Sequence, residues 1–95
     1  VYQVRARCGK AIAAYEEAKR IIKAIHGPNH LAVAVTLNNL GNVYQAKALY
    51  PEAIAVYEEA KRIRIATHGP EHLCVAETLN NLGRVLIEQR RYEEA

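Results

Sequence analysis

The sequence predicts an all-α fold in which antiparallel helix–turn–helix units stack on one another. Within each unit the apolar residues recur at spacings of three and four, which places them on one face of a helix. The same Gly-Pro pair interrupts this pattern twice, and strand-like alternation is absent. The chain also repeats itself: a shift of 42 residues superimposes Tyr15–Ile21 on Tyr57–Ile63 and Thr36–Gly41 on Thr78–Gly83 without a change.

The helix boundaries can be predicted from these apolar faces and from the residues that interrupt the pattern. Gly27-Pro28 and Gly69-Pro70 each join a cap glycine to a residue that cannot continue a helix. Pro51 suits a first helical turn, because that turn leaves its N–H groups unpaired anyway. The expected elements are the end of one helix over residues 1–7, four helices near 10–25, 31–47, 52–67 and 73–89, and the start of another at Tyr92. In units, these elements form a partial repeat over 1–30, a full repeat over about 31–72 and a partial repeat over about 73–95.

Small residues indicate how the helices pack. Gly41 and Gly83 lie in the middle of expected helices, where glycine costs about 0.5–1 kcal/mol relative to alanine. We therefore expect a neighbouring helix to approach closely at both glycines. Tyr15 and Tyr57 are expected to fill the space between helix pairs, next to the small surfaces of Ala53 and Ala60 and their counterparts.

These residues carry a resemblance to a known family. The pattern Leu-x-x-Leu-Gly-x-x-Tyr at Leu37–Tyr44, followed by Tyr50, Ala53, Tyr57 and Ala60, resembles the tetratricopeptide repeat. The 42-residue period and the His-Gly-Pro-x-His turn are similar to the kinesin light chain type of this repeat. The resemblance covers essentially the whole chain. It implies a right-handed superhelical solenoid that acts as a non-catalytic protein–protein interaction scaffold and holds a peptide segment of a partner in its concave groove.

The resemblance also implies where the peptide would lie. The first helices of successive units line the concave face. On these helices, polar residues spaced by three and four lie beside the apolar residues of the core. A carboxamide can both donate to and accept from a peptide backbone, and an arginine can bind an acidic side chain through two hydrogen bonds. The residues expected to contact the peptide are Asn38, Asn42, Gln45, Asn80 and Arg84.

Two other roles are open for the asparagines of this region. Asn38 and Asn80 could be polar residues that only face solvent. Asn39 and Asn81, one step further round the helix, are expected to form hydrogen bonds between helices rather than to contact a ligand.

The histidines are the candidate metal ligands. Two histidines four residues apart can bind zinc when both lie on one helix, but a Gly-Pro pair breaks the helix between them here. We therefore expect no metal site and no cofactor, and we expect the turn histidines to cap a helix. These histidines form two pairs, His26 with His30 and His68 with His72.

Composition argues against an enzyme. The chain has no serine, no aspartate and no glycine-rich phosphate loop, and Cys8 and Cys74 have no evident histidine to activate them. The glutamate pairs of the repeat, at residues 16–17 and 58–59, are explained as surface charges, with Glu16 reaching Arg20 and Glu58 reaching Arg62 at i+4.

The remaining sequence features concern the cellular location of the protein and the alternatives to peptide binding. Two cysteines far apart in the sequence indicate reduced, buried thiols and a cytoplasmic protein. The sequence contains no stretch of 18 apolar residues, so it predicts no membrane-spanning helix. Helical repeats can read RNA, but a net charge of +3 that is evenly spread makes nucleic acid a poor candidate partner. Self-association end to end, through the outer faces of the terminal helices, is the alternative to peptide binding.

Overall fold

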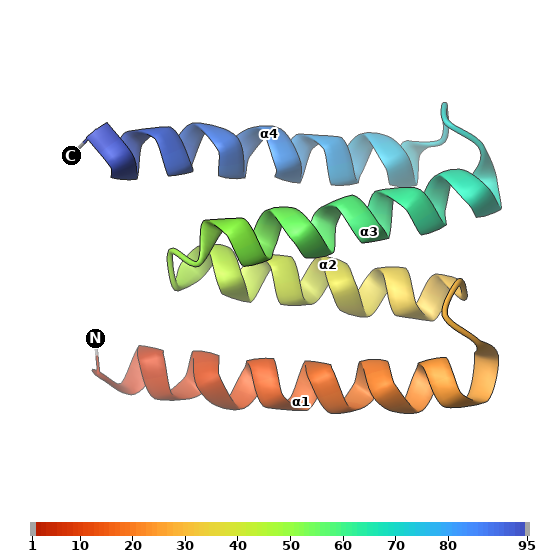
Figure 1. Cartoon of the computed structure of the whole chain (residues 1–95), viewed down its shortest axis with the longest axis horizontal. Helices are drawn as coiled ribbons and strands as arrows, with labels where there is room; N and C mark the ends of the chain where they lie inside the picture. The colour runs from red at the N-terminus through yellow and green to blue at the C-terminus, as the bar shows by residue number, and fades with distance from the viewer. Residues whose placement is uncertain (1, 95) are drawn as a thin grey trace.

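Four helices, each antiparallel to the one before it, make up the described part of the chain (Figure 1). The computed structural model describes the backbone of residues 2–94 and the side chains of residues 8–94. The described residues contain no strand, so the all-α prediction is confirmed. The helices are α1 (Tyr2–His26), α2 (Leu31–Ala46), α3 (Tyr50–His68) and α4 (Leu73–Glu94).

Two of the expected helix breaks are wrong. α1 runs through residues 7–10 and α4 runs through residues 89–92 without interruption. At the corresponding place between α2 and α3 the chain does turn, where Ala48 adopts a φ of 60° and Pro51 enters the first turn of α3. Only this middle unit has a proline at that position, since its counterparts are Gly9 and Glu93. Without a proline to remove an N–H, the helix continues.

The Gly-Pro turns join α1 to α2 and α3 to α4. Gly27 and Gly69 have φ values of 90° and 88°, which favour glycine. The histidine that follows each turn caps the next helix, as expected: His30 Nδ1 accepts from the backbone N–H of Ala32 at 3.0 Å, and His72 Nδ1 accepts from Cys74 N–H at 3.0 Å. Each capping bond satisfies an N–H that would otherwise lack a helical partner.

The core lies in two clusters on either side of α3. One cluster joins α2 to α3 and the other joins α3 to α4, so α3 is covered on both sides. The fully buried members of the first are Val33, Ala34, Leu37, Ala60 and Ile63. Those of the second are Ala53, Tyr57 and Val85, with Leu82 almost as buried.

The two mid-helix glycines differ in their surroundings. A Cβ on Gly41 would overlap the ring of Tyr57, so α3 approaches α2 closely at this point, as the sequence predicts. A Cβ on Gly83 would meet no described atom within 4 Å. The expectation of a close approach at Gly83 is therefore wrong for the described part of the chain.

Surface ion pairs follow a different spacing from the one expected. Glu16 pairs with Lys19 and Glu17 with Arg20, in both cases at i+3, with N···O distances of 2.8 and 2.7 Å. In α3 the pair Glu58–Lys61 repeats this spacing at 2.8 Å. Among residues 2–94, no helix combines the length and the apolar character needed to cross a bilayer.

Candidate functional site

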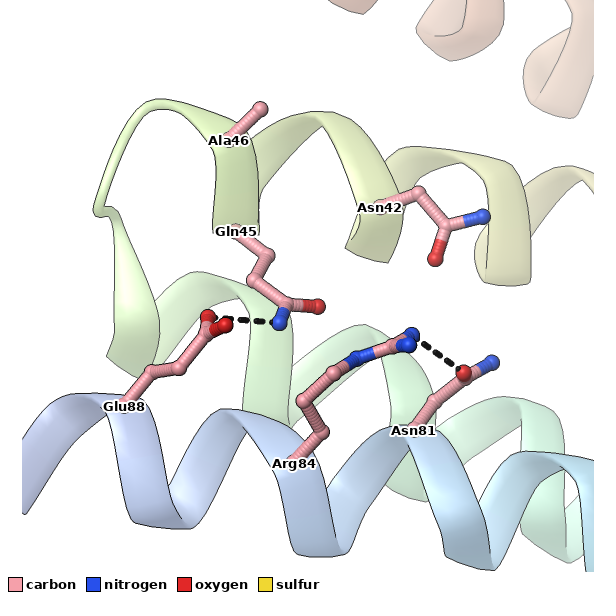
Figure 2. A pocket seen from close by; sticks show the side chains of 6 residues that line it. All are labelled: Asn42, Gln45, Ala46, Asn81, Arg84 and Glu88. Atoms are coloured by element: carbon pink, nitrogen blue, oxygen red, sulfur yellow. Dashed lines mark hydrogen bonds between the residues drawn. The ribbon is translucent and has the colours of Figure 1, made fainter.

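An open pocket of about 540 Å³ lies between α2 and α4, the equivalent helices of two successive units (Figure 2). Ala46 is its only apolar lining residue among the side chains that the structure describes. The lining residues are Asn42, Gln45 and Ala46 from α2, and Asn81, Arg84 and Glu88 from α4.

Tyr57 of α3 supports the α2 wall of the pocket. Its hydroxyl donates to Asn42 Oδ1 at 2.5 Å and lies 3.4 Å from Gln45 Oε1. Burial raises the pKa of the Tyr57 phenol above its ordinary value of 10.0; the positive charge of Arg84 opposes this rise and the carboxylate of Glu88 adds to it. The phenol is therefore protonated at neutral pH and acts as a donor. Asn42 Oδ1 accepts this bond, and the two amide N–H groups of Asn42 remain as donors for a ligand.

Hydrogen bonds across the pocket tie α2 to α4. Gln45 Nε2 donates to Glu88 Oε1 at 2.6 Å. On the other side, Asn81 Nδ2 donates to Asn38 Oδ1 at 3.1 Å. These bonds connect side chains 43 residues apart in sequence and hold the two walls at a fixed separation.

Arg84 supplies the positive charge of the pocket. Its Nη2 donates to Asn81 Oδ1 at 2.8 Å, which fixes the guanidinium against the wall (Figure 2). It takes part in none of the ion pairs between described side chains. A guanidinium has five N–H donors, so most of those of Arg84 can reach a ligand.

Of the five residues expected to contact a peptide, three line the pocket and two do not. Asn42, Gln45 and Arg84 line the pocket together. Asn38 is half-buried and acts on the pocket through its hydrogen bond with Asn81. Asn80 is exposed and does not line the pocket.

Sequence reasoning missed Asn81 and Glu88 as lining residues. Asn81 does form the hydrogen bond between helices that the sequence predicts, and it also faces the pocket. Both residues share one helix face with Arg84, three positions before it and four after it. That spacing was the available signal.

Comparison with known proteins bears on what such a pocket is for. The family model described as tetratricopeptide repeat matches the chain twice, over residues 1–64 and over residues 33–95. None of the curated proteins compared with the chain matches it. Repeats of this family generally mediate interactions between proteins, and the family is typically a non-catalytic scaffold.

Proposed function

We propose that this chain, which belongs to the tetratricopeptide repeat family, is a non-catalytic scaffold that holds a peptide segment of a partner protein between α2 and α4. The observation that carries the proposal is the polar pocket on these two helices. Side chains from two successive units face one open space there, and hydrogen bonds already fix most of them. Pre-organised donors lower the entropy cost of binding.

The chemistry of the pocket favours an extended segment with an acidic side chain. The amide N–H groups of Asn42 can donate to a backbone carbonyl of the peptide. The free N–H groups of Arg84 can bind a carboxylate through two parallel hydrogen bonds. Glu88 places a negative charge one helical turn from Arg84, which disfavours a second acidic side chain at that end of the pocket.

The test is a peptide-display selection on the immobilised protein, in parallel on the Arg84→Glu and Asn42→Ala variants. We expect the parent to enrich a shared motif with an acidic residue. Arg84→Glu should then weaken binding of a motif peptide by at least about tenfold, because a like charge replaces a charge-assisted hydrogen bond.

Asn80→Ala is the matched control, since Asn80 is exposed on α4 but lies outside the pocket. This variant should bind the motif peptide as the parent does. Undiminished binding by Arg84→Glu, with circular dichroism showing that the variant is folded, would contradict the proposal.

A second candidate function, end-to-end self-association, is supported by apolar faces on the two outer helices. In α4, Leu79 is 49% exposed, whereas its counterpart Leu37 in α2 is fully buried. In α1, Ile21 is 43% exposed, whereas its counterpart Ile63 in α3 is fully buried. Leu37 and Ile63 belong to one core cluster. The α1 helix of a second copy could therefore cover α4 much as α3 covers α2.

A further inference from the structure

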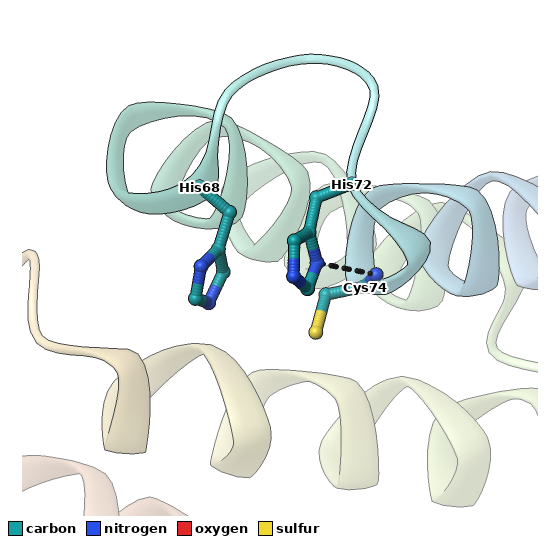
Figure 3. Close-up of side chains that lie close together, drawn as sticks. All are labelled: His68, His72 and Cys74. Carbon is teal, nitrogen blue, oxygen red and sulfur yellow. Dashed lines mark hydrogen bonds between the residues drawn. The ribbon is translucent and has the colours of Figure 1, made fainter.

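The turn between α3 and α4 gathers three side chains that are metal ligands in other proteins. His68 ends α3, His72 caps α4, and Cys74 lies in the first turn of α4. The two imidazole rings stack with their centroids 4.1 Å apart and their planes 16° apart. One ligand atom from each residue lies within 4.8 Å of the other two (Figure 3). The Gly-Pro pair breaks the helix between the two histidines, as the sequence predicts, and the resulting turn stacks one ring on the other.

We propose that His68, His72 and Cys74 form a binding site for Zn²⁺. Two imidazole nitrogens and one thiolate are a donor set that Zn²⁺ favours, at distances of about 2.0–2.1 Å to nitrogen and about 2.3 Å to sulfur. The ligand atoms lie within 4.8 Å of each other. Because a metal ion lies in the plane of each imidazole that binds it, the two rings must turn out of their stacked arrangement to reach these distances. The two histidines are exposed, so the fourth position of the metal is open to water.

The backbone that carries Cys74 is held firmly. The carbonyl oxygen of Cys74 accepts from Arg64 Nη1 at 3.0 Å and from Thr78 Oγ1 at 3.2 Å. Arg64 is itself buried, and its Nη1 also donates to Thr78 Oγ1 at 3.0 Å. Because α3 supplies both Arg64 and His68, these bonds hold the backbone of Cys74 against the helix that ends at His68.

Metal binding competes with the cap of α4. A neutral imidazole carries one proton, so His72 Nδ1 accepts from Cys74 N–H only while Nε2 holds that proton. Coordination by Nδ1 uses the same lone pair, and coordination by Nε2 moves the proton to Nδ1. In both cases the capping bond is lost, and the thiol proton of Cys74 passes to the solvent. Zn²⁺ affinity should therefore rise with pH.

The first turn of the chain provides an internal comparison. His26 and His30 stack there in the same way, with centroids 4.4 Å apart and planes 22° apart. The residue that corresponds to Cys74 is Ala32, so this turn has the two imidazoles without the thiol. The second turn is therefore the one that offers Zn²⁺ two imidazoles and a thiolate.

The test is titration of the reduced protein with Co²⁺, a spectroscopic substitute for Zn²⁺, followed by displacement with Zn²⁺. We expect one Co²⁺ per chain, a thiolate-to-cobalt charge-transfer band, and loss of that band when Zn²⁺ is added. Cys74→Ala should remove the band and weaken Zn²⁺ binding more than about 100-fold, since loss of an outer-shell partner alone costs 10–100-fold. Cys8→Ala, which removes the other cysteine, should leave the band unchanged.

Two further variants separate ligation from folding. His72→Asn removes a ligand but supplies a good capping side chain, so it should lose the metal and keep the helix content. Ala32→Cys completes the first turn and should add a second Co²⁺ equivalent with its own thiolate band. A band that persists in Cys74→Ala, no band in the parent, or one Co²⁺ per two chains would each overturn the proposal.

Discussion

At the scale of single residues, Gly41 and Gly83 occupy the same position of successive units but face different surroundings. The ring of Tyr57 fills the space that a Cβ on Gly41 would need, whereas a Cβ on Gly83 meets no described atom. Within the described chain a neighbour requires glycine at position 41, whereas no described neighbour requires it at position 83. The repeat alone could not distinguish the two.

This difference predicts opposite effects for one substitution. Gly41→Ala should lower the free energy of unfolding by about 1–3 kcal/mol, because the added methyl displaces a buried aromatic ring. Gly83→Ala should raise it by about 0.5–1 kcal/mol, since alanine is the better helix former. Urea unfolding followed by circular dichroism measures both. Equal effects at the two positions would contradict this account of the packing.

The repeat also failed to predict which residue of α4 lies opposite Asn38. A shift of one period carries Asn38 onto Asn80, and this shift suggested that both face the groove. The side of α2 that faces α4 carries Asn42 and Gln45, whereas the side of α4 that faces α2 carries Asn81, Arg84 and Glu88. The residue of α4 that meets Asn38 is therefore Asn81, one position round the helix.

At the scale of elements, the Gly-Pro turns decide how the helices follow one another. Gly69 has a φ of 88° and a ψ of 164°, a region that only glycine adopts readily. It ends α3 and lets His72 reach the start of α4, where it caps the helix. The sequence predicted this turn because glycine and proline act through local backbone geometry.

Gly69→Ala should lower the free energy of unfolding by about 1–3 kcal/mol through backbone strain alone. A Cβ at this position meets nothing within 4 Å, so no steric clash contributes. Glu71→Ala, a change of an exposed side chain in the same turn, is the control and should alter stability by no more than about 0.5 kcal/mol. If both variants unfold at the same urea concentration, the glycine is not needed for its φ.

At the scale of the whole molecule, the two outer helices expose apolar residues whose counterparts in α2 and α3 are buried, and we proposed that these faces pack on each other. A head-to-tail contact of this kind joins different surfaces of identical chains, so it does not close on itself and can extend. Leu79 of one copy would share an apolar cluster with Ile21 of the next, as Leu37 and Ile63 do within one chain.

Light scattering against concentration tests this contact. The parent should form larger species as its concentration rises, and Leu79→Glu and Ile21→Glu should each remain monomeric, because each buries a charge in one of the two faces. An equimolar mixture of the two variants should form dimers and nothing larger, since only one face of each is intact. A parent that stays monomeric at high concentration would exclude self-association.

The sequence by itself determined the repeat, the helical class, the Gly-Pro turns and their capping histidines, because these depend on local backbone preferences and on periodicity. It also indicated Asn42, Gln45 and Arg84 as candidate binding residues, because they are polar and lie beside the apolar face of their helices. The tertiary structure alone decided which side of α4 faces α2, that Tyr57 supports the pocket wall, and that two imidazoles and a thiol meet in one turn. These features depend on how separate helices and side chains are placed relative to each other in space, which a pattern along the chain does not encode.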